Sequence, residues 1–310
     1  MSFGAGFLRH PDLFPARRAG EPWGDRAVAL DVAGGPYLLS GLAAAQEEAL
    51  RRRFGPLCGP VSGGGTASQV FRAPAGDFLP IDTRGWEYTL DLDPTPDALR
   101  VAGLHLMARL GWTPALAGAL WTPETAGEEW TSVCENYLRL LTAYRLLEQG
   151  GALLHSAGVA GGKGAWLLLG PSGAGKTTAS RLCLAGGGTV LSDDLNAVTF
   201  EDGGAARLRK LPFTGDLGDR AGGPESVPLR AVLRLAQGTE EGLRPLSPAA
   251  ALASLVAAAP FVNRDPFRRE ALLAVLERLA RAVPAWEVTF SREGRLWAIL
   301  QSISIPRAGP

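Results

Sequence analysis

The chain has 310 residues, 46% of them hydrophobic, and its 31 lysines and arginines balance 31 aspartates and glutamates. This length is enough for two modest domains. A net charge of zero provides no bulk electrostatic attraction to nucleic acid or to an anionic membrane, so neither is an expected partner.

The distribution of apolar residues and cysteines points to the cytoplasm. No apolar run approaches the ~18 residues that a membrane-spanning helix needs, and residues 1–24 contain no apolar segment of signal-peptide length. The three cysteines lie far apart and form no C-x-x-C pair, which argues against a disulfide or metal framework. The sequence leaves the oligomeric state open, a homo-oligomer included.

The N-terminal part of the chain predicts a small domain after an irregular start. Residues 1–25 are rich in Gly, Pro and Arg, which is typical of irregular structure. Residues 26–148 are expected to form an accessory or substrate-recruiting α+β domain. Its first helix is predicted over 40–51, because Ala and Leu dominate that stretch and Ser40 can cap it.

The rest of this domain mixes strands and helices. Alternating apolar and polar residues predict strands over 69–72 and 88–92. Residues 98–110 are expected to be helical or a mixture of strand and helix. Apolar residues at helical spacing predict a long linking helix over 121–149, whose aromatic residues we expect to pack in a core.

A glycine-rich stretch follows the linking helix. The sequence GPSGAGKT, residues 170–177, fits the phosphate-binding pattern G-x-x-x-x-G-K-[ST] at every fixed position. The apolar run 165–169 before it suits a buried strand, and a helix can begin at Thr177. The residues expected to bind the nucleotide are Gly170, Pro171, Ser172, Gly173, Ala174, Gly175, Lys176, Thr177 and Thr178.

The chemistry of this stretch follows from its residue types. Glycines allow the backbone to turn tightly and bring its N–H groups to phosphate oxygens, and a helix N-terminus adds partial positive charge. Lys176 is expected to reach the β- and γ-phosphates of ATP, and the Thr177 hydroxyl to bind Mg²⁺. A plain glycine-rich turn between strand and helix is the alternative.

Acidic residues follow the next predicted strand, 189–192. Asp193 and Asp194 end that strand, where paired carboxylates can hold a metal and accept a proton from a hydroxyl. A solvated Asp-Asp turn is the alternative. His155 ends the strand before the glycine-rich stretch, and a structural role and a catalytic role are both open to it.

Further strands and helices alternate after Asp194. Strands are predicted over 196–200, 206–209, 229–235 and 286–290, and helices over 247–259 and 267–282, with a short one near Trp297. Residues 214–228 are rich in Gly and acidic residues and suit a mobile substrate loop beside the site.

The succession of His155, GPSGAGKTT and SDD resembles the catalytic domain of bacterial HPr kinase/phosphorylase and its HPr-kinase-related relatives, and more distantly ATP-dependent phosphoenolpyruvate carboxykinase. The specific resemblance covers residues 150–200, and a looser one in the order of elements extends to about residue 300. It implies an α/β fold with a P-loop kinase core of this type over 149–305, preceded by the small α+β domain. It also implies ATP on the P-loop with Lys176, Mg²⁺ held by Thr177 and Asp194, Asp193 as general base, and His155 near the phosphates.

One motif of that family is absent. HPr kinases carry a signature of the form E-x-x-G-x-G that helps to engage the HPr protein, whereas the corresponding residues 211–218 read LPFTGDLG. The resemblance therefore points to the stand-alone relatives, some of which belong to peptide-modifying gene clusters and phosphorylate peptides.

Three functions compete at this point. The leading one is a Mg²⁺- and ATP-dependent kinase that acts on a hydroxyl, most simply a serine of a peptide or small protein, with a small molecule as the other acceptor class. The second is a nucleotide-hydrolysing switch that regulates a partner protein; the chain has no guanine-reading N-K-x-D, which weakens its GTPase form. The third is a carboxykinase-like lyase, for which three histidines and three lysines offer few ligands.

Overall fold

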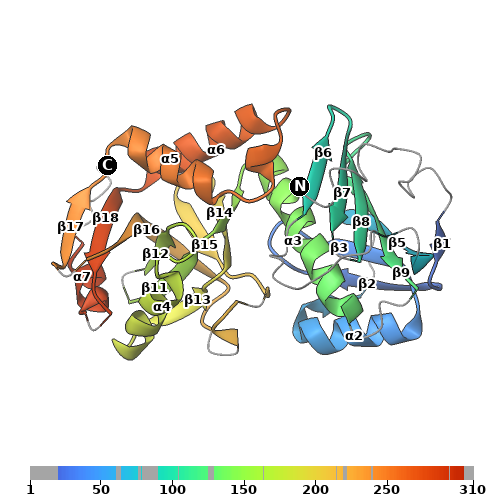
Figure 1. Ribbon diagram of the computed structural model, residues 1–310, viewed down its shortest axis with the longest axis horizontal. Coiled ribbons are helices and arrows are strands. Elements are labelled where there is room, and N and C mark those ends of the chain that lie inside the picture. Colours follow the sequence, from blue (N-terminus) through green and yellow to red (C-terminus); the bar gives the residue numbers. More distant parts are fainter. Residues whose placement is uncertain are drawn as a thin grey trace. The chain divides into compact units, whose positions relative to one another are not determined.

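The computed structural model describes residues 20–60, 64–75, 78, 90–103, 105–124, 129–162, 164–213, 215–218, 222–238, 240–292 and 294–303. The chain divides into two compact units (Figure 1): Met1–Arg145 with Arg264–Phe267, and Leu146–Asn263 with Arg268–Pro310. Each unit holds one sheet with helices packed on it, so the predicted mixed α/β fold is confirmed. No helix among the described residues is long and apolar enough to cross a bilayer. Residues 1–19 of the predicted irregular start, and residues 88–89 of a predicted strand, lie outside the described part.

The first unit is built on a mixed sheet. Its strands follow the order β4 (Cys58–Gly59), β2 (Arg26–Leu30), β3 (Tyr37–Leu42), β5 (Thr66–Ala73), β9 (Ala117–Pro123), β8 (Leu106–Gly111), β7 (Ala98–Gly103) and β6 (Asp91–Pro94), with β1 (Glu21–Pro22) beside β5. Among the described strands of this first sheet, only the pairs β3–β5 and β5–β9 are parallel. The 3₁₀ turn η2 (Gly55–Leu57) leads into β4.

Two helices, α2 (Ala44–Phe54) and α3 (Trp130–Glu148), complete this unit. Arg53 of α2 and Glu135 of α3 form an ion pair of 2.8 Å, and Tyr137 of α3 shares a buried hydrogen bond of 2.7 Å with Ser68 of β5. Gly118 of β9 lies where a Cβ would come within 1.8 Å of the Tyr137 hydroxyl. The glycine is therefore what lets α3 approach the sheet this closely.

Three sequence predictions in this unit are wrong, all because strand pairing overrode a helical composition. Ser40 lies in β3, where it donates to Gln69 of β5, and α2 begins four residues later. The range 98–110 contains the antiparallel strands β7 and β8, most of whose residues are buried, although Ala and Leu favour helices in isolation. Trp121 lies in β9, stacked on Phe71 of β5, so the linking helix begins only at Trp130.

The second unit has its own mixed sheet. Its strands follow the order β10 (Ala152–His155), β14 (Leu195–Phe200), β15 (Ala206–Arg209), β16 (Ser226–Gln237), β12 (Gly164–Leu169), β11 (Ala157–Gly161) and β13 (Thr189–Ser192); β18 (Ala285–Phe290) pairs with β16 and with β17 (Gly242–Pro245). The pairs β12–β16 and β16–β18 are parallel, and the others are antiparallel.

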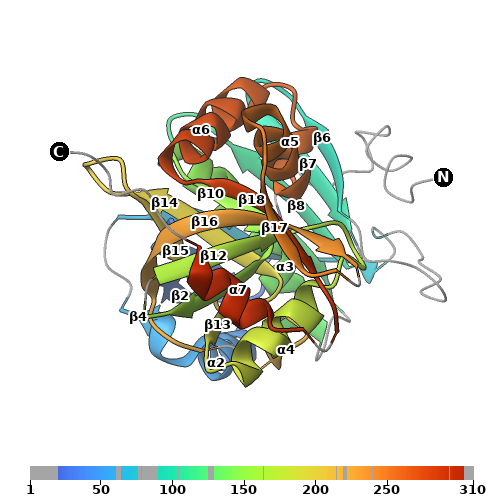
Figure 2. The ribbon, with the colours of Figure 1, turned by 90° about the vertical axis from the view of Figure 1, so that its left-hand side faces the viewer.

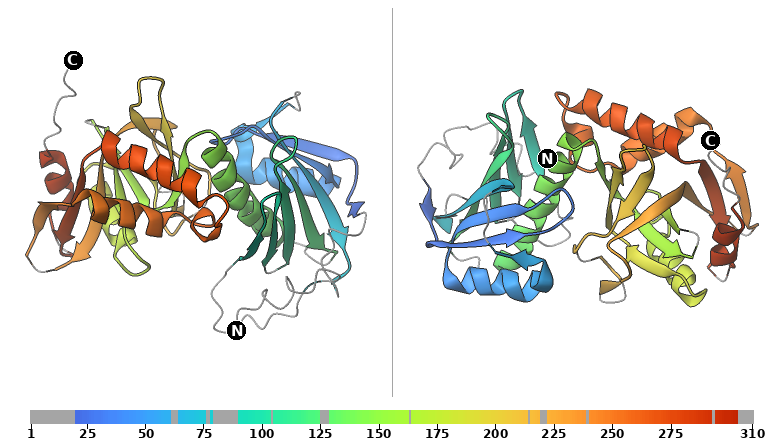
Figure 3. Two further views of the ribbon diagram at one scale, coloured as in Figure 1. Left: turned by 90° about the horizontal axis from the view of Figure 1, so that it is seen from above. Right: turned by 180° about the vertical axis from the view of Figure 1, so that it is seen from behind.

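Helices cover both faces of this sheet. Figure 2 shows α5 (Pro248–Ala258) and α6 (Arg269–Ala282) on one face, and α4 (Lys176–Ala185) and α7 (Leu296–Ser302) on the other. Helices α5 and α6 pack side by side (Figure 3), and the 3₁₀ turn η6 (Val262–Arg264) lies between them in the chain. Ser247 caps α5 as predicted, since its hydroxyl accepts from the Ala250 N–H at 3.2 Å.

Burial on both faces explains the apolar run of β12. Every residue of Gly164–Leu169 is buried, as expected for a central strand between two helical layers. Trp166 of this strand meets Trp297 of α7 edge to face, with ring centroids 5.5 Å apart. The end of β12, where the glycine-rich loop begins, is thereby fixed by the core of the unit.

Candidate active site

The glycine-rich loop joins β12 to α4, as predicted, and its shape depends on its glycines. Gly173 and Gly175 have φ angles of 80° and 95°, which residues with a Cβ rarely adopt. A Cβ on Gly170 would lie 2.5 Å from that of Ala174. The side chain of Gln237, at the end of β16, donates to the Gly173 carbonyl at 3.0 Å. The close approach of Gly170 to Ala174 and the hydrogen bond from Gln237 thus fix the shape of the loop where it leads into α4.

Lys176 is the first residue of α4 and folds back over this loop. Its Nζ donates to the carbonyl of Gly170 at 2.9 Å and to that of Pro171 at 3.3 Å. The residue is 8% exposed. Burial lowers the pKa of the Lys176 ammonium, and the nearby charge of Asp194 opposes that shift. The loop therefore carries a single positive charge at a helix N-terminus, an arrangement suited to anions.

Thr177 contacts an acidic residue that the sequence analysis did not single out. Its hydroxyl donates to Asp216 Oδ2 at 3.0 Å. Asp216 belongs to segment 214–228, which the sequence marked as a loop beside the site, yet nothing in the pattern distinguished Asp216 from the other acidic residues there. The prediction that Thr177 and Asp194 form the metal pair stays a prediction, and Asp216 becomes a second carboxylate in position for it.

Asp193 lies beneath the same segment and is 6% exposed. Its Oδ2 accepts the backbone N–H of Leu217 at 3.1 Å, and a Cβ on Gly215 would come within 2.1 Å of its Oδ1. Burial raises the pKa of the Asp193 carboxyl above its ordinary value; backbone N–H donors oppose this shift, and the charges of Asp216 and Asp194 add to it. Asp193 is thus a carboxylate with increased affinity for a proton.

Asp194 faces the opposite way and pairs with His155. The distance from His155 Nδ1 to Asp194 Oδ1 is 3.1 Å. The backbone joins the two strand ends as well, because the Ser156 N–H donates to the Asp194 carbonyl at 2.9 Å. The buried Asn196 amide donates to the Ser156 carbonyl at 2.8 Å and thereby adds a second hydrogen bond between the chain segments that follow His155 and Asp194. The distant positions 155 and 194 therefore meet because β10 and β14 are neighbours in the sheet.

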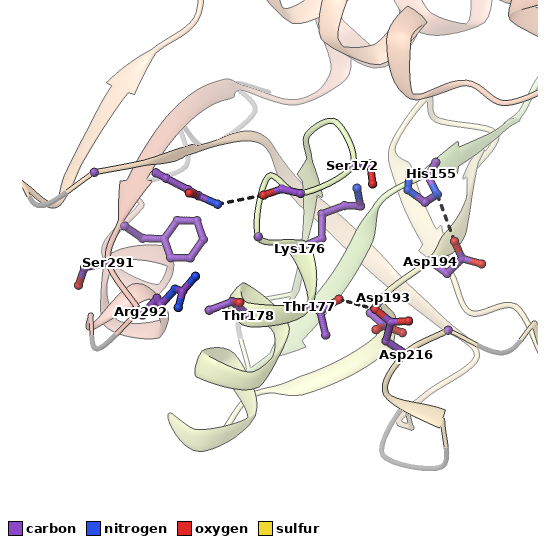
Figure 4. A pocket seen from close by; sticks show the side chains of 16 residues that line it. His155, Ser172, Lys176, Thr177, Thr178, Asp193, Asp194, Asp216, Ser291 and Arg292 are labelled. Atoms are coloured by element: carbon purple, nitrogen blue, oxygen red, sulfur yellow. Dashed lines mark hydrogen bonds and ion pairs between the residues drawn. The ribbon is translucent and has the colours of Figure 1, made fainter. Parts of the chain in front are cut away.

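These side chains surround one cavity of about 890 Å³ (Figure 4). Of the residues predicted from the sequence, it is lined by His155, Ser172, Gly173, Gly175, Lys176, Thr177, Thr178, Asp193 and Asp194. Gly170, Pro171 and Ala174 do not line it. Residues that the sequence analysis missed form the rest of its wall: Gly215, Asp216, Gln237, Gly238, Phe290, Ser291 and Arg292. No recognisable pattern marks the last five, which come together only through the pairing of β16 with β18.

The acidic side chains of the site do not form a closed metal cage. Among the described residues, no three His, Cys, Asp or Glu side chains are grouped to hold a metal. Mg²⁺ at phosphate sites keeps several waters and takes one or two carboxylates together with phosphate oxygens. The Thr177 hydroxyl and the Asp216 carboxylate, 3.0 Å apart at the mouth of the loop, fit that requirement.

These observations define a mixed α/β protein with a glycine-rich loop, one buried lysine and three carboxylates around a single cavity. The model of the family described as SynChlorMet cassette protein ScmC matches residues 125–304, more than half of the chain, and the chain belongs to that family. The matched range contains every residue of the cavity. No curated protein matches the chain.

Proposed function

We propose that the protein is an ATP- and Mg²⁺-dependent phosphotransferase of the HPr-kinase-like P-loop class, which transfers the γ-phosphoryl group to a hydroxyl, a serine of a peptide or small protein. The observation that carries this proposal is the placement of Lys176. Its ammonium lies on the carbonyls of a glycine-rich loop at a helix N-terminus, and Asp193, Asp194 and Asp216 line the same cavity. Phosphoryl transfer depends on such positioning and charge neutralisation.

Each part of the loop has a task in this reaction. The backbone N–H groups at the start of α4 and the Lys176 ammonium hold the phosphates of the substrate ATP. Thr177 would hold Mg²⁺ together with Asp216 or Asp194. The ion, when bound, neutralises charge on the phosphate oxygens. Gln237 keeps the loop in its binding shape through the Gly173 carbonyl.

Asp193 is the proposed general base. Its raised pKa makes it a stronger proton acceptor than an ordinary carboxylate, and it accepts the proton of the acceptor hydroxyl as the new O–P bond forms. Asp194 pairs with His155, and its charge favours the charged form of the Lys176 ammonium. Asp193→Asn should abolish transfer while ATP still binds; full transfer by this variant would remove Asp193 from the role.

The first test is transfer of labelled γ-phosphate from ATP, with Mg²⁺, into an extract of the source cells. The wild-type chain should label a discrete peptide, protein or metabolite, and Lys176→Ala should not. Lys210→Ala is the matched control, because Lys210 does not line the cavity and should label as the wild type does. Label released only as inorganic phosphate would reject the kinase and favour a nucleotide-hydrolysing switch.

A further inference from the structure

A second cavity opens on the other side of the glycine-rich loop. Its volume is about 510 Å³, within the range of small-molecule and side-chain sites. It is lined by His155, Leu169, Gly170, Pro171, Ser172, Arg234, Ala253, Ser254, Ala257 and Ala258. His155 and Ser172 also line the larger cavity, so the two cavities meet at these side chains. The function proposed above leaves this second cavity without a role.

The wall of the second cavity is largely apolar. Helix α5 contributes Ala253 and Ala257, one turn apart, and both are exposed. The Ser254 hydroxyl is turned back to its own helix, where it donates to the Ala250 carbonyl at 2.8 Å. The wall that α5 contributes therefore consists mainly of methyl groups, which favour an apolar ligand group.

Arg234, the arginine in this wall, is already paired. Arg234 donates to Glu287 Oε2 through Nε at 2.9 Å and through Nη2 at 2.6 Å. These hydrogen bonds lower the pKa of the Glu287 carboxyl, which keeps it ionised. Arg244 shares the same carboxylate. A charged ligand group in this cavity would have to compete with that pairing, whereas an uncharged group would not.

The position of the cavity fits the direction from which an acceptor must come. In phosphoryl transfer the attacking and leaving oxygens are roughly in line with the phosphorus. His155 and Arg292 lie on opposite sides of Lys176 in the larger cavity (Figure 4). Phe290 offers a ring and Arg292 a cation for a nucleoside on their side of the cavity. With the nucleoside there, the γ-phosphate would lie toward Lys176 and the acceptor would approach from the His155 side, where the second cavity opens.

We propose that the second cavity binds an aliphatic or aromatic side chain next to the acceptor serine of a peptide. This inference rests on the proposed kinase function. The serine oxygen then forms its bond to the γ-phosphorus while the bond from that phosphorus to the bridging oxygen breaks. ADP leaves with the electron pair, and the serine proton passes to Asp193.

The test uses the full-length chain, labelled ATP, Mg²⁺ and arrays of end-capped octapeptides with one central serine. In each array one flanking position is fixed as Gly, Leu, Phe, Asp or Lys, and the others are mixed. Leu or Phe next to serine should give at least ~10-fold more label than Gly or Asp, the scale expected when a hydrophobic pocket is filled or left empty. Ala257→Phe and Ala253→Leu, which fill the cavity from exposed positions, should remove this preference.

Ala249→Phe is the matched control, because Ala249 is an exposed alanine of α5 outside the cavity wall; it should keep the wild-type preference. ATP affinity, measured in parallel, should be the same for all three variants if their fold is intact. Transfer without an apolar preference, or a preference that survives in both cavity-filling variants, would overturn this inference and leave the kinase standing. Absence of label from every array, with ATP still bound, would overturn the peptide kinase and this inference with it.

Discussion

Substitution of Gly215 would show whether the segment over Asp193 positions this carboxylate, the proposed general base. A Cβ at this position would lie 2.1 Å from Asp193 Oδ1, whereas ordinary van der Waals contacts begin at 3.4 Å. In Gly215→Ala the segment or the carboxylate must therefore move by about 1 Å, a displacement that can reduce catalysis ~10²-fold. The same movement breaks the 3.1 Å hydrogen bond from the Leu217 N–H. Lost support of an ionised acceptor is worth about 1.5–3 kcal/mol.

The assay for Gly215→Ala is the initial rate of phosphoryl transfer, together with the dissociation constant for ATP. We expect the rate to fall ~10²-fold and ATP affinity to stay within about 3-fold, because Gly215 and Asp193 do not belong to the loop that holds the phosphates. Gly203→Ala is the matched control: its φ is ordinary and no atom lies within 4 Å of the added methyl group. A wild-type rate in Gly215→Ala would refute the assignment of Asp193 and its covering segment to the reaction.

Three further predictions concern protonation, magnesium and packing. Burial raises the pKa of Asp193 in the folded chain, so on acidification the transfer rate should fall at a higher pH than it would for an ordinary carboxyl. For the same reason, the contribution of Asp193 to the free energy of unfolding should increase as the pH falls through its folded pKa. At saturating Mg²⁺, Asp216→Asn should move the acid limb of the rate profile to lower pH, and an unchanged limb would contradict the charge coupling between Asp216 and Asp193. Asp216→Asn should also raise the Mg²⁺ concentration for half-maximal rate by ~10-fold or more, as loss of a ligand or its support does, and an unaltered requirement would assign the ion to other residues. Gly118→Ala should lower the free energy of unfolding, measured in urea, by about 1–3 kcal/mol, because its methyl group would lie 1.8 Å from the Tyr137 hydroxyl. Gly111→Ala is the control and should leave that free energy unchanged, because the space around Gly111 is open. Equal stability of the two variants would contradict the close packing of Tyr137 on Gly118.

How well the fold could be predicted depended on what stabilises each element. The strands and helices of the second unit were predicted well, since β12 is buried on both faces and α5 begins with Ser247 and Pro248. In the first unit, residues 98–110 have the composition of a helix, but β7 and β8 pair with each other and β8 also pairs with β9. Strand pairing joins residues that are far apart in the chain, and no local sequence pattern predicts it. The predicted linking helix likewise began too early, at Trp121, because that residue lies in β9.

The candidate site also has a part that the sequence indicated and a part that it did not. Its contiguous part, from Gly170 to Thr178, could be read directly, because phosphate binding requires glycines, a lysine and a hydroxyl at fixed spacing. The meeting of His155 with Asp194 follows from the pairing of β10 with β14, which the sequence analysis did not predict. Phe290 and Arg292 join the cavity through a parallel strand pair across more than fifty residues, so their place had no local signal.

Asp216 shows that the absence of a motif says less about a site than the presence of one does. Residues 211–218 lack the E-x-x-G-x-G signature, yet this same stretch supplies a carboxylate to Thr177 and a backbone donor to Asp193. A motif records one solution to a geometric requirement, and here a different sequence places an acidic group and an N–H at the mouth of the loop. The peptide acceptor proposed for the second cavity would be bound there, and not through the HPr-engaging signature that residues 211–218 lack.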